Sequence, residues 1–285
     1  MLAHPLLQHL RIAVSFFLLP TFLFALSQCG TVHWQYAAVL FVVLHLFVYP
    51  SSHLYNNYHD NDTGAVSGLE SPIAKSQAML HLSIVLDVLA LLIIFFISKL
   101  AAVLLLAYIL GSRAYSNRKI RIKKYPIASY VFVSGAQGLV IYFITLFCCS
   151  TAFNLVEHLA PAFIASLYIG SSYPITQIYQ HESDQNDGIR TLSSLLGIIG
   201  TFKFSIVMYT LTHCCLLAYL YATLQHSLIL VYIVANAVPT YFFYLWFRDA
   251  RSNIALVNYK STMKMAAIAS VCGNLCFLIF ILLNA

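Results

Sequence analysis

The sequence predicts an all-α membrane protein, a polytopic bundle of about nine transmembrane helices. Of its 285 residues, 61% are hydrophobic and only 8% are charged, and the mean hydropathy is +0.82. A soluble domain has about 25% charged residues, so a soluble fold is excluded. The net charge of +6 does not indicate a nucleic-acid partner, because the position of charges in a membrane chain matters more than their sum.

A transmembrane helix needs about 20 mostly apolar residues, and nine stretches meet or approach this length. The expected spans are residues 8–28, 34–54, 79–97, 100–114, 127–148, 155–178, 193–221, 226–247 and 265–284. The fourth is short and nearly continuous with the third. No soluble domain fits between the spans, so we expect a single domain over residues 1–285.

The basic residues support this span count. With the N-terminus on one side, every lysine and arginine except Lys99 falls on that same side. The positive-inside rule then places the N-terminus and the loops after even-numbered spans in the cytoplasm, and the C-terminus outside. We expect a multi-pass protein of a bacterial inner (plasma) membrane. All acids except Asp87 and Glu157 share the basic side, although topology does not require acids there.

Two clusters hold most of these acids: the first polar segment, "SHLYNNYHDNDTG" at 52–64, and the second polar segment, "YQHESDQNDG" at 179–188. Asn56 and Asp60 are four residues apart, as are Gln180 and Asp184. If the preceding helices continue into these segments, each pair shares a helix face. Oxygen ligands suit Mg²⁺, which binds through one or two carboxylates together with substrate phosphates.

Between the two segments in sequence lies the basic linker, "RKIRIKK" at 118–124. Two acidic helix ends beneath a basic loop predict a metal–diphosphate site. An alternative is that the polar segments are ordinary loops, since Asp and Asn favour turns. The basic linker alone could equally be a topology signal or a patch for anionic lipids.

These motifs resemble those of the UbiA superfamily of intramembrane prenyltransferases, which has nine spans with polar loops after the second and sixth. The family's first motif is N-D-x-x-D-x-x-x-D. Asn56 and Asp60 match it, whereas Asn57 and Gly64 stand where the family has aspartates.

The family's second motif is D-x-x-x-D, and here Asp184 matches while Gln180 replaces the leading aspartate. The "GIRTLSSLLG" that follows is similar to the family's G-x-[KR]-T-L run. The family's Y-x-x-x-K motif is intact as Tyr115 to Lys119. Each motif alone is weak, but their order and loop positions together cover essentially the whole chain.

The resemblance implies transfer of an isoprenyl chain from a prenyl diphosphate to an unidentified lipid-soluble acceptor, with Mg²⁺ as cofactor and no nucleic acid involved. Developing charge on the diphosphate would be stabilised by metal and by Lys or Arg. The implied metal ligands are Asn56, Asp60, Asp184, Asp62 and Glu182. The implied diphosphate ligands are Arg118, Lys119, Arg190 and Lys203, and the implied catalytic residues are Asp60, Asp184, Lys119 and Tyr115.

Two other functions remain open from the sequence: a non-catalytic lipid-binding relative with weakened metal binding, and a multi-pass transporter. A transporter more often has inverted repeats and polar groups near the membrane midplane, and no convincing repeat is present. Asp87, inside the third span, is a functional candidate by its position. It could line an acceptor chamber or accept a hydrogen bond from a neighbouring helix. The acceptor and the length of the prenyl chain cannot be predicted.

Overall fold

The computed structural model describes residues 5–60, 64–70, 74–151 and 154–284, and these form helices joined by short connections. The α-helices are α1 (Pro5–His9), α2 (Ile12–Ser15), α3 (Leu19–Ser27), α4 (Trp34–Val42), α5 (Tyr49–His59), α6 (Gln77–Ile97), α7 (Lys99–Ser116), α8 (Pro126–Ser134), α9 (Ile141–Cys149), α10 (Leu155–Thr176), α11 (His181–Asn186), α12 (Leu192–Ala222), α13 (His226–Ser252) and α14 (Tyr259–Asn284). The 3₁₀ segments are η1 (Phe16–Leu18), η3 (Ile122–Lys124) and η5 (Ile254–Leu256), and the π-helical segments are η2 (Val43–Val48) and η4 (Gly135–Val140).

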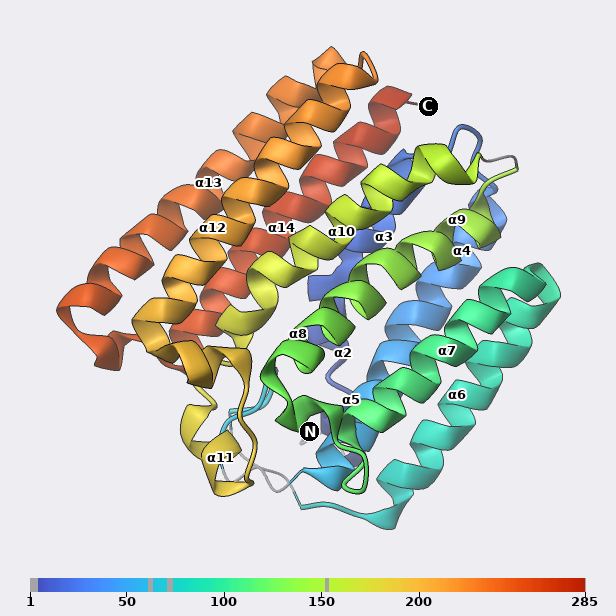
Figure 1. Cartoon of the computed structure of the whole chain (residues 1–285). Helices are drawn as coiled ribbons and strands as arrows, with labels where there is room; N and C mark the ends of the chain where they lie inside the picture. Colours follow the sequence, from blue (N-terminus) through green and yellow to red (C-terminus); the bar gives the residue numbers. More distant parts are fainter. Residues whose placement is uncertain (1–4, 61–63, 71–73, 152–153, 285) are drawn as a thin grey trace.

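Eight helical stretches in the described part of the chain are long and apolar enough to cross a membrane. Two of these stretches each contain a π-helical turn between two α-helices. In one, α4 continues through η2 into α5, and in the other, α8 continues through η4 into α9. α10 is 22 residues long and runs beside them in Figure 1, but it carries Glu157, Pro161 and Pro174 and is less apolar. The all-α membrane bundle predicted from the sequence is therefore confirmed.

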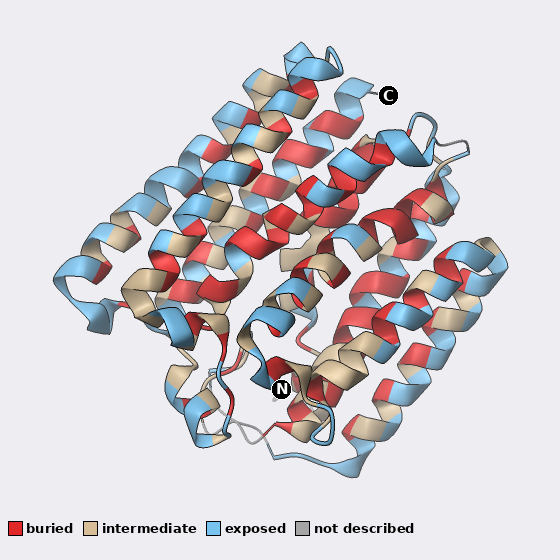
Figure 2. Ribbon diagram, in the orientation of Figure 1, coloured by how far each residue is buried: buried red, intermediate tan, exposed pale blue. Residues whose placement is uncertain are grey.

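The bundle buries its centre and exposes apolar side chains on its outside. α10 packs against α12, α8 and η4, and α3 packs against α9 and α14. In Figure 2 the buried residues gather on these inner helices, whereas α6, α12 and α13 have long exposed faces. Those faces are apolar, with Phe96 84% exposed, Val207 65% exposed and Leu230 67% exposed. Such a surface is compatible with lipid rather than with water.

All of the connections expected on the basic side lie at one end of the bundle. The first polar segment, the basic linker, α11 and the α13–α14 connection meet at the lower end of Figure 1. The C-terminus lies at the opposite end. The arrangement of loops inferred from the lysines and arginines therefore agrees with the fold.

Helix boundaries differ from the prediction at three places. The first span is interrupted at Arg11, which adopts the left-handed conformation (φ 48°) between α1 and α2. α12 begins with a separate turn before Gly197, whose φ of 69° is accessible mainly to glycine. The second polar segment is also not a continuation of α10, because the chain turns at 177–180 before α11 starts.

Candidate functional site

The first polar segment begins in α5 and leaves the helix before its acid. α5 ends at His59, and Asp60 has extended backbone angles (φ −81°, ψ 151°), although its N–H still donates to the Asn56 carbonyl oxygen at 2.9 Å. The predicted sharing of one helix face by Asn56 and Asp60 is therefore wrong. The side-chain oxygen of Asn56 instead accepts a hydrogen bond from the Ser116 hydroxyl on α7, at 2.7 Å.

Asp60 is buried and forms an ion pair with Lys123 of the basic linker. The residues are only 4% and 6% exposed, respectively. Removing two charges from water costs several kcal/mol per ion, and a close partner must offset that cost. The linker is thereby attached to the first polar segment through its most buried charge.

Asn57, which stands where the family has an aspartate, faces the N-terminal segment. Its side-chain oxygen accepts a hydrogen bond from the Arg11 guanidinium, and its amide nitrogen lies 3.2 Å from Nδ1 of His9. The neutral residue therefore has its own partners, both outside the acidic cluster. These contacts explain why an asparagine stands at position 57, which the family motif did not predict.

The second polar segment forms the short helix α11 and its flanking turns. Asp184 is half-buried, and its backbone N–H donates to the Gln180 carbonyl oxygen at 2.8 Å. Asp187 pairs with Arg121 and lies 3.6 Å from the Arg118 guanidinium. His181 approaches the Ser193 hydroxyl at 2.7 Å, and burial lowers the pKa of its imidazole, which is therefore neutral at pH 7.

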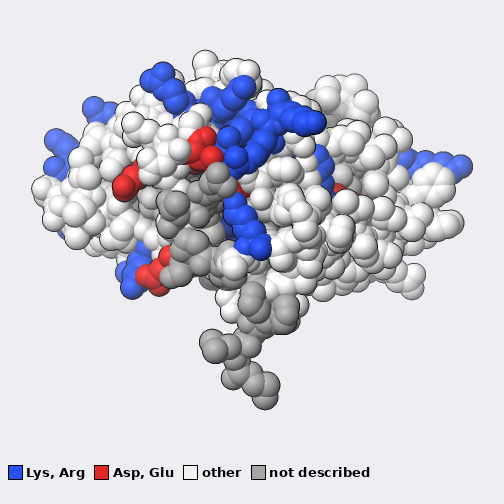
Figure 3. Space-filling model, turned by 90° about the horizontal axis from the view of Figure 1, so that it is seen from below, with Lys and Arg blue, Asp and Glu red and all other residues white. Residues whose placement is uncertain are grey.

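The basic linker connects the two polar segments. Arg118 donates from Nε to the His59 carbonyl oxygen at 2.7 Å, and its guanidinium also approaches Asp187. Together with the Lys123–Asp60 and Arg121–Asp187 pairs, this places the linker across both acidic regions. Figure 3 views this end and shows Lys and Arg gathered beside Asp and Glu.

Two tyrosines join the segments on the inner side. The hydroxyl groups of Tyr115 (α7) and Tyr173 (α10) are 2.7 Å apart. Asp60 interacts electrostatically with Tyr115, and Asp184 interacts electrostatically with Tyr173. The structure therefore brings Asp60 and Asp184, which are far apart in the sequence, near the same hydrogen-bonded tyrosine pair.

In the described part of the chain, the structure shows no ion pair between the site and the other residues predicted for it. Glu182, Lys119, Arg190 and Lys203 have exposed side chains and form no ion pair with any described residue. Asp62 lies outside the described residues. Their roles remain predictions.

The sequence did not single out Arg121, Lys123 or Tyr173, which make the contacts that connect the site. The two basic residues were visible only as members of a charged run. Tyr173 belongs to no motif, and its hydroxyl is held by Ser129 at 3.1 Å and by Gln177 at 2.8 Å.

Asp87 is part of a buried polar network next to the site. It pairs with Arg113 of α7 and accepts a hydrogen bond from the Ser51 hydroxyl of α5 at 2.6 Å. The Arg113 guanidinium also lies 4.1 Å from the Tyr55 ring centroid, a cation–π contact. Of the two roles considered for Asp87, the structure supports pairing between helices.

The network reaches the basic linker through Tyr55. Its hydroxyl accepts a hydrogen bond from the Asn117 amide at 2.9 Å, and Asn117 immediately precedes the linker. Asp87 and Arg113 therefore help to fix where α7 ends and the linker begins.

The donor chemistry of the site fits a hard cation bound together with phosphate. Among the described residues, no group of three or more His, Cys, Asp or Glu is placed to hold a metal alone. Asp60 and Asp184 nevertheless supply one carboxylate from each polar segment, and Mg²⁺ commonly takes its other ligands from water and substrate phosphates. The residues therefore fit a shared metal–diphosphate group rather than an isolated ion.

The chain is an intramembrane helical protein with a polar site at one end of its bundle. Two acidic segments and the basic linker form that site. The model of the UbiA prenyltransferase family matches residues 14–268. The chain belongs to this family, as its motifs predicted. A comparison with curated proteins finds no match to the chain.

Solved structures share the fold. A UbiA homolog from Archaeoglobus fulgidus bound to DMAPP and Mg²⁺ has a TM-score of 0.68 and 17% identity, covering 98% of this chain and 99% of that one. The same homolog bound to GPP and Mg²⁺ has a TM-score of 0.63 and 16% identity, covering 96% and 100%. A digeranylgeranylglyceryl phosphate synthase structure has a TM-score of 0.60 and 16% identity, covering 98% and 96%.

Proposed function

We propose that the chain acts, as a single domain over residues 1–285, as a membrane prenyltransferase that moves an isoprenyl chain from a prenyl diphosphate to a lipid-soluble acceptor. The observation that carries this proposal is the meeting of Asp60, Asp184 and the basic linker at one end of the bundle. The bound DMAPP, GPP and Mg²⁺ of the homologous structures support the same donor chemistry.

Asp60 and Asp184 would hold Mg²⁺ with the diphosphate, with Asn56 and Glu182 as further oxygen donors. When bound, Mg²⁺ would withdraw charge from the diphosphate as the allylic C–O bond breaks. Arg118, Lys119, Arg190 and Lys203 would bind the diphosphate oxygens, and Tyr115 would orient this side of the site by hydrogen bonding. Fixed cations in a site that excludes water stabilise such charge strongly.

The prenyl cation formed by this cleavage must be protected from water until it reacts. The diphosphate end of the site borders the apolar bundle, so the prenyl chain would lie among the helices while its diphosphate remains at the polar end. For a proton lost by the acceptor, His181 is a candidate base, because its imidazole is neutral and lies on the same segment as Asp184.

The activity is tested with purified protein, labelled prenyl diphosphates of several lengths and a membrane lipid extract as the source of acceptor. We expect a labelled lipid-soluble product that disappears when a chelator removes Mg²⁺ and returns when Mg²⁺ is added. Binding of the labelled donor without any product would instead favour a non-catalytic lipid-binding relative. Product formation unchanged in chelator would remove the metal from the mechanism.

Restoring the family aspartate at position 57 should have little effect on the metal requirement. The introduced carboxylate would still face Arg11, which already contacts the Asn57 side chain, and would form an ion pair with it. We therefore expect Asn57→Asp to leave the half-saturating Mg²⁺ concentration within about twofold, because a strong charge-assisted hydrogen bond to Arg11 would hold the new carboxylate. A fall of about tenfold or more, equivalent to about 1.4 kcal/mol, would show that position 57 reaches the metal.

We further propose that the site end faces the cytoplasm of a bacterial inner membrane and that the C-terminus lies outside. Lys119→Cys at the site end and Leu224→Cys between α12 and α13 place one exposed thiol at each end of the bundle. A membrane-impermeant thiol reagent added to intact cells should label the thiol at position 224 and not the thiol at position 119. The unsubstituted protein, with seven cysteines, sets the background. Equal labelling of both positions would contradict the orientation.

A further inference from the structure

A groove lies between α12 and α13, away from the polar end of the bundle. Its volume is about 530 Å³ and its lining includes His213, Leu217, Tyr232, Asn236 and Ala237. Both helices expose apolar side chains along their outer faces, so the groove opens where the bundle would meet lipid. A molecule entering it would therefore come from the bilayer.

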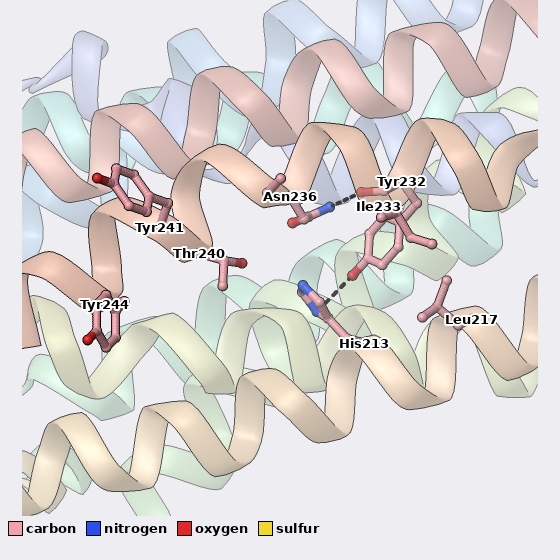
Figure 4. A pocket seen from close by; sticks show the side chains of 9 residues that line it. His213, Leu217, Tyr232, Ile233, Asn236, Thr240, Tyr241 and Tyr244 are labelled. Atoms are coloured by element: carbon pink, nitrogen blue, oxygen red, sulfur yellow. Dashed lines mark hydrogen bonds between the residues drawn. The ribbon is translucent and has the colours of Figure 1, made fainter.

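The floor of the groove is a chain of polar groups at membrane depth. The Tyr209 hydroxyl donates to the side-chain oxygen of Asn236 at 3.0 Å, and the Asn236 amide donates to the Tyr232 carbonyl oxygen at 2.9 Å. The Tyr232 hydroxyl lies 3.0 Å from Nδ1 of His213, as Figure 4 shows. Polar groups in this environment are costly and are functional candidates by default.

One buried atom of this hydrogen-bonded group of side chains has no hydrogen-bond partner among the described residues. Nε2 of His213 is buried and forms no hydrogen bond with any described residue. The Tyr232 hydroxyl also makes no second hydrogen bond with a described residue, so donation to Nδ1 of His213 is the arrangement that satisfies its proton. Nε2 then carries the imidazole N–H and requires an acceptor.

The depth of His213 limits the source of that acceptor. His213 lies nine residues before the end of α12, or about 14 Å along the helix axis. Asn236 lies ten residues after the start of α13, at a similar depth. The hydrocarbon core extends about 15 Å from its centre to each interface, so these residues lie well below the ester carbonyls of the bilayer lipids. A ring-borne carbonyl on a mobile lipid-soluble molecule can reach this depth.

We propose that the groove between α12 and α13 binds a lipid-soluble ring compound whose carbonyl oxygen accepts a hydrogen bond from Nε2 of His213. Leu217, Ile233 and Ala237 line the same groove within about one helical turn of His213 or Asn236 and offer apolar surface for the ring. The site is separate from the diphosphate site and does not depend on the proposed transferase activity.

Benzophenone is a suitable probe because it is a lipid-soluble aromatic ketone that inserts into nearby C–H bonds under ultraviolet light. Purified protein in lipid nanodiscs is irradiated with benzophenone, and adducts are located by peptide mass spectrometry. We expect adducts on α12 and α13 around the groove to exceed those on the lipid-exposed face of α6. Diphenylmethane, which has the same two rings without the carbonyl, should compete poorly.

Three substitutions test the binding directly. His213→Phe keeps a ring but removes the donor, and we expect labelling at the groove to fall about fivefold, the effect of about 1 kcal/mol from one hydrogen bond. His213→Gln keeps an N–H donor and should retain most of the labelling. Ala237→Leu fills the exposed side of the groove without changing the polar chain, and it should also abolish labelling there.

The same experiments can also overturn the proposal. Labelling that is no stronger at the groove than on α6, or that persists in both His213→Phe and Ala237→Leu, would show that only bulk lipid partitioning occurs. Effective competition by diphenylmethane would show that the groove binds rings without using the carbonyl, and would contradict the role of His213.

Discussion

Asp60→Asn should lower the rate of prenyl transfer by at least about 100-fold, the range found when one charge-stabilising group is removed from an active site. The carboxylate is the acid of the first polar segment that lies beside Tyr115 and faces the basic linker. An amide retains the shape and one oxygen of the side chain but loses the charge that holds a metal–diphosphate group. The rate is measured with a labelled prenyl diphosphate at saturating Mg²⁺.

The matched control is Lys123→Met, which breaks the same buried ion pair from the other side. If Asp60 served only to pair with Lys123, the two variants would lose activity equally. We expect Lys123→Met to cost about tenfold or less, equivalent to about 1.4 kcal/mol, because both carboxylates that would hold the metal–diphosphate group remain. Asp249→Asn, at an exposed ion pair with Arg248 at the same end, should retain the full rate. Equal losses in Asp60→Asn and Lys123→Met would reduce Asp60 to a structural residue.

Asp87→Leu should destabilise the protein by about 3 kcal/mol, because breaking a buried ion pair leaves an uncompensated charge. Here the charge left behind is Arg113, which also contacts Ser51, Ser83 and the Tyr55 ring. These remaining contacts satisfy its hydrogen bonds but not its charge. The measurement is the shift in the unfolding transition of the purified protein in detergent, followed by circular dichroism.

The double variant Asp87→Leu/Arg113→Met separates charge from packing. Replacing both partners of a buried pair by apolar residues is often neutral or stabilising. We therefore expect the double variant to recover most of the stability that Asp87→Leu loses. If the double variant is as unstable as the single one, the contribution of the pair comes from the hydrogen-bonded network with Ser51 and Ser83 rather than from charge compensation.

Much of the architecture could be predicted because membrane insertion imposes strong rules on sequence. Apolar stretches of span length and the segregation of Lys and Arg determined which loops share one end, and the fold agrees. The local break at Asp60 could not be predicted in the same way. The sequence "NNYHDND" lacks glycine and proline, and its several Asn and Asp residues favour a turn without indicating at which of them the helix ends.

The ion pairs between the basic linker and the acidic segments show a second limit of prediction from the sequence. Six basic residues occur from Arg113 to Lys124, and composition does not indicate which of them turns inward. The choice depends on the backbone: Arg121 adopts a left-handed conformation (φ 50°), after which Lys123 is buried against Asp60 while Lys119 remains exposed. Lys123 therefore reaches Asp60 after the left-handed turn at Arg121, whereas Arg118 reaches the same segment before it, through the His59 carbonyl oxygen.

The most direct test of the central claim is the binding of Mn²⁺, used as a paramagnetic substitute for Mg²⁺, in the presence of a prenyl thiolodiphosphate that resists cleavage. Electron paramagnetic resonance should detect bound Mn²⁺ with coupling to phosphorus, and this signal should be lost in both Asp60→Asn and Asp184→Asn. Retention of the phosphorus-coupled signal in either variant would contradict the claim that one carboxylate from each polar segment holds the same diphosphate.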